Sequence, residues 1–238
     1  MATLNIFSAG AAQAAVSQIA EKFERESGNS VNAAYGAIGA MKARVVAGEP
    51  ADVIVLSSAM IDELIEAGFV VPGTRVDLDK VGTGVAVREG TPLPDVRTVE
   101  VLRGNLLAAK RVVCPDPAVA TAGKVVMKVL STLGITAELE PRMQFFPNGY
   151  AAMADLAESK ALLEIGITQI TEIKANDGVT YVGPLPPEVQ NIAVYSVGLG
   201  ARSADPERAR ELIRRLTGFN AQTVLSAAGF DVGGEAAS

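Results

Sequence analysis

The sequence contains no histidine and no tryptophan, and Cys114 is its single cysteine. It therefore cannot build a His/Cys metal site, a Ser-His-Asp triad or an internal disulfide, and we expect no metal and no cofactor. Aromatic residues make up 5% of the chain, which disfavours a sugar cleft of stacked rings and favours a small polar ligand. Cys114 ends a strand pattern before a proline, so we expect an inert buried thiol.

Positive charge is also scarce. Lys and Arg number 21 against 27 Asp and Glu, and the formal net charge is -6. No segment forms a block of Lys and Arg, so the chain lacks the positive charge that binds the phosphate backbone of a nucleic acid. No apolar run reaches the roughly 18 to 20 residues of a membrane span, so we expect no membrane insertion. Because 49% of the residues are apolar, the chain is expected to fold into a soluble globular protein.

The first ten residues, MATLNIFSAG, contain neither the basic segment nor the apolar segment of a secretory leader. The simpler interpretation is a cytoplasmic protein. A periplasmic protein whose leader had been removed would begin in the same way, so both compartments stay open.

Strand, turn and helix patterns alternate along the chain. Three apolar strands, each followed by small residues and a helical pattern, are expected at residues 4–8, 30–35 and 52–56. Such βα units predict a parallel sheet with right-handed crossovers. A second series has its strands at residues 111–114, 143–146 and 163–167, and the chain closes with a strand at 192–199 and helices at 205–216 and 222–228.

Two segments are suited to carry the chain between these two series. Residues 81–87 are extended and interrupted by glycine, and the strand at 192–199 is long and apolar. We therefore predict an α/β fold of two Rossmann-like lobes joined by two crossing strands. Lobe I would comprise residues 1–80 and 195–238, and lobe II residues 81–194.

Turns of small residues follow five of the predicted strands. In doubly wound sheets, ligands bind at the carboxyl ends of strands, where helix N-termini present unpaired N–H groups. Ordinary helix capping explains any one turn, but five on the same edge of two lobes favour a binding cleft. No turn matches GxGxxG or a P-loop. The candidate ligand-binding residues are Ser8, Ala9, Gly10, Ala11, Gly36, Ala37, Ile38, Gly39, Ser57, Ser58, Thr121, Ala122, Asn148, Gly149, Thr168 and Gln169.

The order of these motifs resembles that of the molybdate-binding proteins of ABC importers, which are type II periplasmic binding proteins. The resemblance spans nearly the whole chain, through residues 7–11, 35–40, 50–54, 68–75, 116–117 with 122–123, and 228–230. It implies two hinged lobes that close over a small anion, and an importer permease as partner if the protein is exported.

Three positions depart from the family pattern. The resemblance implies serine hydroxyls in the first two turns, where this chain has Ala11 and Ile38, and a tyrosine where it has Gln169. An anion that loses its water shell on binding needs hydrogen-bond donors in its place, and these three side chains supply no hydroxyl donor. Molybdate and tungstate are therefore disfavoured as ligands. The neutral donors that remain suit an organic acid with more than one carboxylate, and they are Ser8, Ser57, Ser58, Thr121, Asn148, Thr168 and Gln169.

Two functions stay open. One is a binding protein that delivers a small oxyanion or carboxylate to an importer or another partner. The other is a cytosolic isomerase or tautomerase of a small polycarboxylate, because the superfamily that the chain resembles includes an aconitate isomerase. A 1,3-proton shift needs a base and an anion hole, and the candidate bases are Lys124, Tyr150 and Glu164. A structural role would follow if the cleft were filled by its own side chains, which the bulky Ile38 permits.

Overall fold

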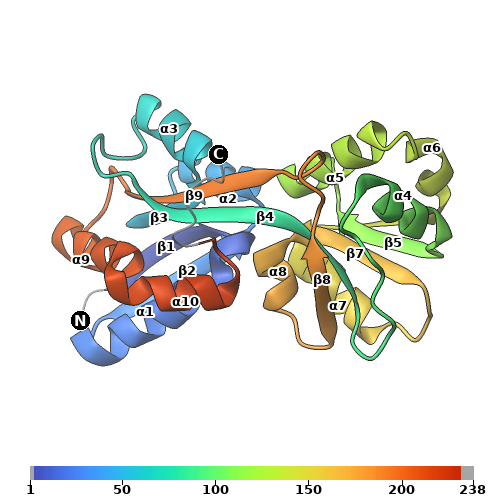
Figure 1. Cartoon of the computed structure of the whole chain (residues 1–238). Helices are drawn as coiled ribbons and strands as arrows, with labels where there is room; N and C mark the ends of the chain where they lie inside the picture. Colours follow the sequence, from blue (N-terminus) through green and yellow to red (C-terminus); the bar gives the residue numbers. More distant parts are fainter. Residues whose placement is uncertain (1–2, 232–238) are drawn as a thin grey trace. The chain divides into compact units, whose positions relative to one another are not determined.

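Residues 3–231 are described by a computed structural model, and they form two compact units (Figure 1). Unit 1 takes in the described residues up to Val81 and those from Ala193 onward, and unit 2 is Gly82–Ile192. The chain passes from one unit to the other inside strand β4 and again at the start of strand β9. No helix among residues 3–231 is both long and apolar enough to cross a membrane.

Unit 1 is built on a sheet whose strand order is β2-β1-β3-β9. Strand β1 runs parallel to β2 and β3, and β9 runs antiparallel to β3. Figure 1 shows α1, α9 and α10 together on one face of this sheet and α2 and α3 on the other. The bounds are β1 Thr3–Ala9, η1 Gly10–Ala12, α1 Gln13–Ser27, β2 Ser30–Gly36, α2 Ile38–Val46, β3 Val53–Ser57, α3 Ser58–Glu66, β4 Val76–Arg88, β9 Ile192–Leu199, α9 Pro206–Thr217 and α10 Phe219–Ala228.

Apolar spacing explains the packing of α1. Val16, Ile19, Ala20 and Phe23 recur every three or four residues, so they share one face of the helix, and all four are buried. Gly28 ends the helix in a left-handed conformation with φ of 69°, which costs glycine little. The core of unit 1 therefore lies between its sheet and helices such as α1.

Unit 2 is built on a sheet in which β7, β5 and β6 are parallel and β4 runs antiparallel to β7. Strand β8 pairs with the other edge of β4. The bounds are α4 Val99–Ala108, β5 Arg111–Pro115, α5 Thr121–Thr132, α6 Thr136–Leu139, η2 Glu140–Arg142, β6 Met143–Phe146, α7 Gly149–Glu158, β7 Glu164–Gln169, α8 Ile170–Lys174 and β8 Val179–Pro184. Unit 2 has its own core, formed by residues such as Leu102, Leu130 and Ile167.

Four elements of unit 2 were absent from the sequence prediction, namely α4, the short helices α6 and η2, and β8. Helix α4 contains Gly104, which weakens its helical pattern, but the hydroxyl of Thr98 caps it by accepting from Val101 N. Strand β8 ends in Gly183 and Pro184, which read as a chain break. Proline fits there because the last residue of an edge strand need not donate to the ladder.

Candidate functional site

The strand ends of unit 1 bring the predicted turns of that unit together. Ala9 is paired with Gly36 in the parallel β1–β2 ladder, and Ser8 is paired with Val55 in the β1–β3 ladder. The carboxyl ends of β1, β2 and β3 therefore share one edge of the sheet. Strand β1 is followed directly by η1 and then α1, β3 is followed directly by α3, and β2 is followed by α2 after one residue.

The helices at this edge begin without side-chain caps. The N-cap residues Ala9, Ala12, Ala37 and Ser57 make no capping hydrogen bond through a side chain. By contrast, Asp205 caps α9, away from this edge, by accepting from Arg208 N. The first N–H groups of a helix have no partner within the helix, so three neighbouring helix starts here present main-chain donors and the positive ends of helix dipoles.

Two of the predicted hydroxyl donors at this edge form hydrogen bonds within unit 1. Ser8 is fully buried, and its hydroxyl donates to the carbonyl of Ala9 at 3.1 Å. The hydroxyl of Ser58 lies 2.9 Å from that of Ser196 and 3.2 Å from the carbonyl oxygen of Val194. Both hydroxyls therefore have internal partners, and the expectation that Ser8 and Ser58 donate to a ligand stays a prediction.

The other predicted ligand residues at this edge differ in whether their side chains can donate a hydrogen bond. Ser57 is half-buried and does not cap α3, so its hydroxyl is a side-chain donor at this edge. Ala11 is 4% exposed, and Ile38 packs against the core as the first residue of α2. Neither supplies a hydroxyl, so an anion at this edge would be bound mainly by main-chain N–H groups.

Unit 2 has a corresponding edge. Strands β5, β6 and β7 are parallel, and Asp116 N, just past β5, donates to Phe146 O at the end of β6 at 2.7 Å. Helices α7 and α8 follow β6 and β7, and α5 follows β5 after a short turn. This edge collects the remaining candidates, which are Thr121, Ala122, Asn148, Gly149, Thr168 and Gln169.

A buried carboxyl group, Glu172, lies at this edge and was missed by the sequence reasoning. It is 5% exposed and accepts from the hydroxyl of Thr168 at 2.5 Å and from the main-chain N–H groups of Gly149 and Gln169. Thr168 is fully buried and its hydroxyl donates to Glu172, and its role as a ligand donor stays a prediction. The signal was present, because a Glu three residues after a helix N-cap, here Gln169, commonly reaches back to the N–H of that residue.

Burial changes the titration of this cluster. It raises the pKa of Glu172, and the hydrogen bonds from Thr168, Gly149 and Gln169 oppose this shift without cancelling it. Tyr150, half-buried in the first turn of α7, has a raised pKa because of burial and then because of the nearby charge of Glu172. The phenol of Tyr150 therefore keeps its proton at neutral pH.

The other two proposed bases differ from Tyr150 in their surroundings. Lys124 is exposed in the first turn of α5. Glu164 begins β7, at the opposite end of the strand from Gln169, and both its oxygens accept from Arg111, at 2.8 and 2.9 Å. The candidate base Glu164 therefore does not lie at this edge, because its carboxylate belongs to an ion pair at the other end of the strand.

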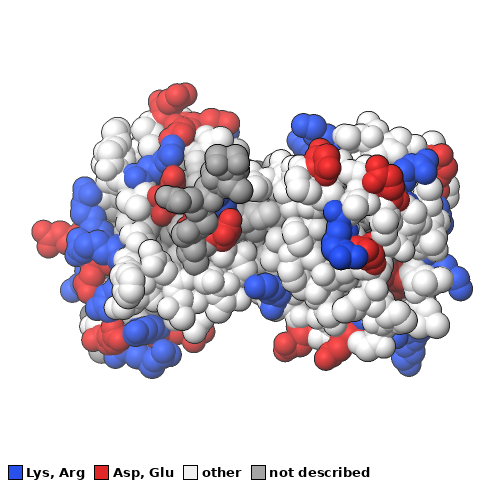
Figure 2. Space-filling view, in the orientation of Figure 1, with Lys and Arg blue, Asp and Glu red and all other residues white. Residues whose placement is uncertain are grey.

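Neither metal binding nor thiol chemistry is suggested by the described residues. Among residues 3–231, no three His, Cys, Asp or Glu side chains come together in a way that could hold a metal ion. Cys114 is fully buried, and burial together with the charge of Asp116 raises its pKa to about 12. Lys and Arg side chains lie beside Asp and Glu side chains on the face drawn in Figure 2. Arg215 forms such an ion pair with Glu26.

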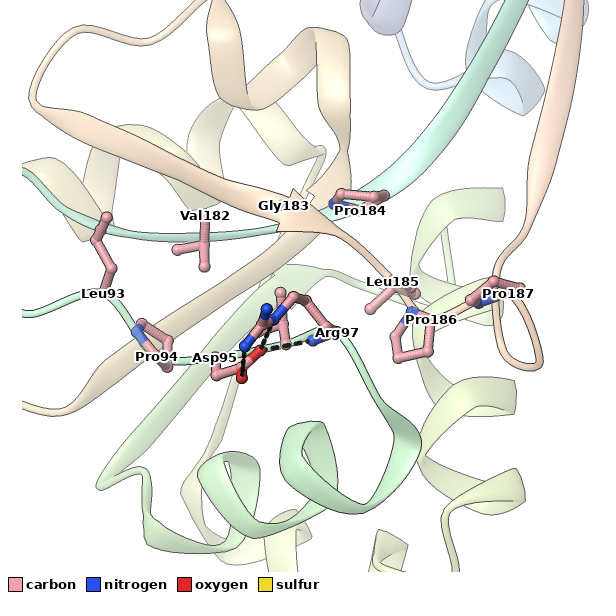
Figure 3. Close-up of a pocket in the computed structure, with 11 residues that line it drawn as sticks. Leu93, Pro94, Asp95, Arg97, Val182, Gly183, Pro184, Leu185, Pro186 and Pro187 are labelled. Carbon is pink, nitrogen blue, oxygen red and sulfur yellow. Dashed lines mark hydrogen bonds and ion pairs between the residues drawn. The ribbon is translucent and has the colours of Figure 1, made fainter.

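A surface pocket of about 480 Å³ lies in unit 2 between residues 93–97 and 182–187 (Figure 3). Its walls are largely proline and aliphatic side chains. The two charged groups that line it, Asp95 and Arg97, pair with each other at 2.7 Å. None of the predicted ligand residues lines this pocket, so it does not extend the candidate site.

The whole described chain matches one family. The model of the bacterial extracellular solute-binding proteins aligns with residues 4–231. The chain belongs to this family. This family member is also similar to an aconitate isomerase from a Pseudomonas species, with 28% identity over 240 residues that cover 95% of this chain and 87% of the relative.

Solved structures extend the comparison. This solute-binding family member resembles the periplasmic molybdate-binding protein of Azotobacter vinelandii, with a TM-score of 0.80 and 22% identity over 95% of this chain and 98% of that one. It also resembles the sulfate-binding protein SubI of Mycobacterium tuberculosis H37Rv, with a TM-score of 0.75 and 18% identity over 97% and 86% of the two chains. The predicted α/β fold of the periplasmic binding protein type is confirmed.

Proposed function

We propose that this protein binds a small organic anion with two or more carboxylates, and that the main-chain N–H groups at the strand-end edge of unit 1 hold its charge. The observation that carries the proposal is the set of uncapped helix starts after β1, β2 and β3. A helix N-terminus with free amides favours an anion. As a solute-binding protein, the chain would deliver this ligand to an importer if it is exported.

The spread of the donors favours a polycarboxylate over one tetrahedral oxyanion. Adjacent strands lie about 4.8 Å apart, so helix starts on the three adjacent strands β2, β1 and β3 cover roughly 10 Å. A single oxyanion would need its donors converging on one point, and the side chains of Ala11 and Ile38 add none there. The aconitate isomerase that the chain resembles is named for a tricarboxylate, which is a ligand of the proposed class.

Replacing Ala37 by aspartate tests this proposal. The new carboxylate would cap α2, accept from its free N–H groups and repel a ligand anion. We expect the affinity for cis- or trans-aconitate, measured by calorimetry, to fall about tenfold or more, while the free energy of unfolding rises by about 1 kcal/mol.

The matched control is Ala47→Asp, which adds the same charge at the exposed C-terminal end of the same helix. It should leave ligand affinity unchanged. The wild-type protein is first titrated with citrate, both aconitates, molybdate, tungstate and sulfate. Binding of molybdate alone, or equal affinities in both variants, would contradict the proposal.

A second candidate function is the isomerisation of such a polycarboxylate. The resemblance to an aconitate isomerase favours it, and so does Tyr150 at the edge of unit 2. A 1,3-proton shift breaks one C–H bond and forms another two carbons away, so the proton that is removed must be returned. A phenol that keeps its proton at neutral pH suits the returning step.

The isomerase candidate is tested by incubating the protein with trans-aconitate in D₂O and following both isomers by NMR. We expect interconversion with deuterium incorporation. Tyr150→Phe should lower kcat about a hundredfold while ligand affinity is retained. If neither conversion nor exchange occurs while aconitate binds, the protein is a binding protein only.

A further inference from the structure

A cavity of about 490 Å³ lies in unit 2 beside the pocket of Figure 3, with which it shares Leu93 and Pro94. Its lining includes residues 108–110 at the end of α4 and residues 162–165 at the start of β7. None of the predicted ligand-binding residues lines it. The cavity has the volume of a small-molecule site and is separate from the candidate site described above.

Three leucines that line this cavity expose most of their surface. Leu93, Leu162 and Leu163 are 60%, 60% and 61% exposed. Single exposed leucines are common on proteins, but these three come from two separate segments and line one cavity. A ligand that covered them would remove apolar surface from water, which favours binding.

The backbone at Leu163 is strained. Its φ is 62°, and it is the one non-glycine residue with positive φ among residues 3–231. Its neighbours hold this conformation, because Lys110 N donates to Leu163 O at 2.8 Å and the next residue, Glu164, pairs with Arg111. Such strain is found at binding sites, where it fixes the direction of a side chain.

The polar groups at the cavity indicate the charge of its ligand. Glu164 lines the cavity, but Arg111 already neutralises its carboxylate. The amide of Asn105 donates to Asp95 O at 2.7 Å. Lys110 lines the cavity and is exposed, and none of the ion pairs within residues 3–231 includes it. The walls therefore suit an apolar body, and the one unpaired cation suits a single negative charge.

We propose that this cavity binds a monocarboxylate with an apolar body, such as a medium-chain fatty acid. The body lies against Leu93, Leu162 and Leu163, and the carboxylate lies at Lys110. This inference does not depend on the proposed function, because the cavity is lined by residues of unit 2 alone. A ligand with several carboxylates is disfavoured here, because the apolar walls leave the additional charges without partners.

The test is an NMR titration of the ¹⁵N-labelled protein with octanoate at pH 7. We expect a Kd of about 0.1 to 1 mM, with amide shifts at residues 108–110 and 162–165. Octan-1-ol has the same chain without the charge and should bind about fivefold more weakly. No binding of octanoate, or shifts confined to other residues, would overturn the inference. The aconitates are titrated separately, so failure of the proposed function is a distinct result.

Leu163→Asn locates the site without endangering the fold. Asparagine adopts positive φ more readily than leucine, so the Tm should not fall, whereas the lost apolar wall should weaken octanoate binding about tenfold. The matched control is Val119→Asn, which changes a 57% exposed residue outside the cavity and should leave the Kd unchanged. Equal affinities in the two variants would overturn the inference.

Lys110→Met tests the charge. It should remove the advantage of octanoate over octan-1-ol, while Lys128→Met, at an exposed position of α5 outside the cavity, should retain it. Sedimentation of the wild type and Leu163→Asn tests the alternative occupant, a second copy of the chain. If the wild type dimerises and Leu163→Asn does not, another protomer covers the leucines and the inference is overturned.

Discussion

Replacing Gly123 by alanine should destabilise the protein by about 3 kcal/mol and lower its Tm by about 10 °C. Gly123 is the third residue of α5, and a Cβ there would lie 2.3 Å from Pro115 O and 2.6 Å from both Asp116 C and Pro117 N. These are backbone atoms of the last residue of β5 and of the turn that follows it, so no side-chain rotation relieves the overlap. The helix must move off the sheet or the turn must deform.

The control for this prediction is Gly39→Ala. Gly39 is the second residue of α2, and nothing lies within 4 Å of its added Cβ. Alanine there should be neutral or stabilising by up to about 1 kcal/mol, because it favours the helix. Both variants are compared by urea unfolding. Equal stabilities for the two would show that the close approach of α5 to β5 does not hold in solution.

Replacing Arg111 by methionine should cost about 3 kcal/mol at pH 7. The guanidinium donates to both oxygens of Glu164, lies 2.7 Å from Asp155 Oδ2 and also bonds Gln144. The side chain of Glu164 is only 8% exposed. Removing Arg111 would therefore leave a buried carboxylate without its cation, which is the costly case for an ion pair.

The cost should depend on pH. Burial alone would raise the pKa of Glu164, but the hydrogen bonds from Arg111 and Ser159 and the charge of Arg111 lower it below its ordinary value. In the unfolded chain the pKa of a glutamate is about 4.3, and in the folded protein the pKa of Glu164 is lower. The ionised carboxylate therefore stabilises the fold above the unfolded-state pKa, and this stabilisation is lost as the pH falls through the folded-state pKa. The difference between wild type and Arg111→Met should therefore shrink from pH 7 to pH 4.

Urea unfolding at several pH values measures this difference. Arg97→Met is the matched control, because Arg97 makes a similar pair with Asp95 but is 86% exposed. That variant should change stability little at any pH, since water and salt screen an exposed pair. A pH-independent loss for Arg111→Met would show that the methionine disturbs packing rather than an ion pair.

The elements that sequence patterns predicted well are those with strong apolar periodicity. Strands β1, β3 and β5 are runs of mostly buried residues, and helices such as α1 and α9 have buried residues that recur every three to four positions. Helix α4 and strand β8 were missed because glycine and proline interrupt their patterns. The Thr98 cap stabilises α4, and pairing with β4 stabilises β8.

The chemistry of the candidate site followed partly from the sequence. Small residues after each strand pointed to uncapped helix starts, and the structure describes such starts at Ala37 and Ser57. It also gives internal partners to Ser8, Ser58 and Thr168. A hydroxyl in a turn looks the same in sequence whether its partner is a ligand or a carbonyl one residue away.

The sequence by itself determined the α/β fold, because alternating strand and helix patterns can bury their apolar faces only by layering helices on a sheet. It also excluded histidine chemistry and a disulfide. Tertiary structure alone decided that Glu164 pairs with Arg111 at one end of β7, and that the N–H group of Gly149 reaches Glu172 at the other end. Arg111 on β5 and Gly149 at the start of α7 are distant in sequence from the carboxyl groups that they contact. These contacts therefore exist only after the chain has folded.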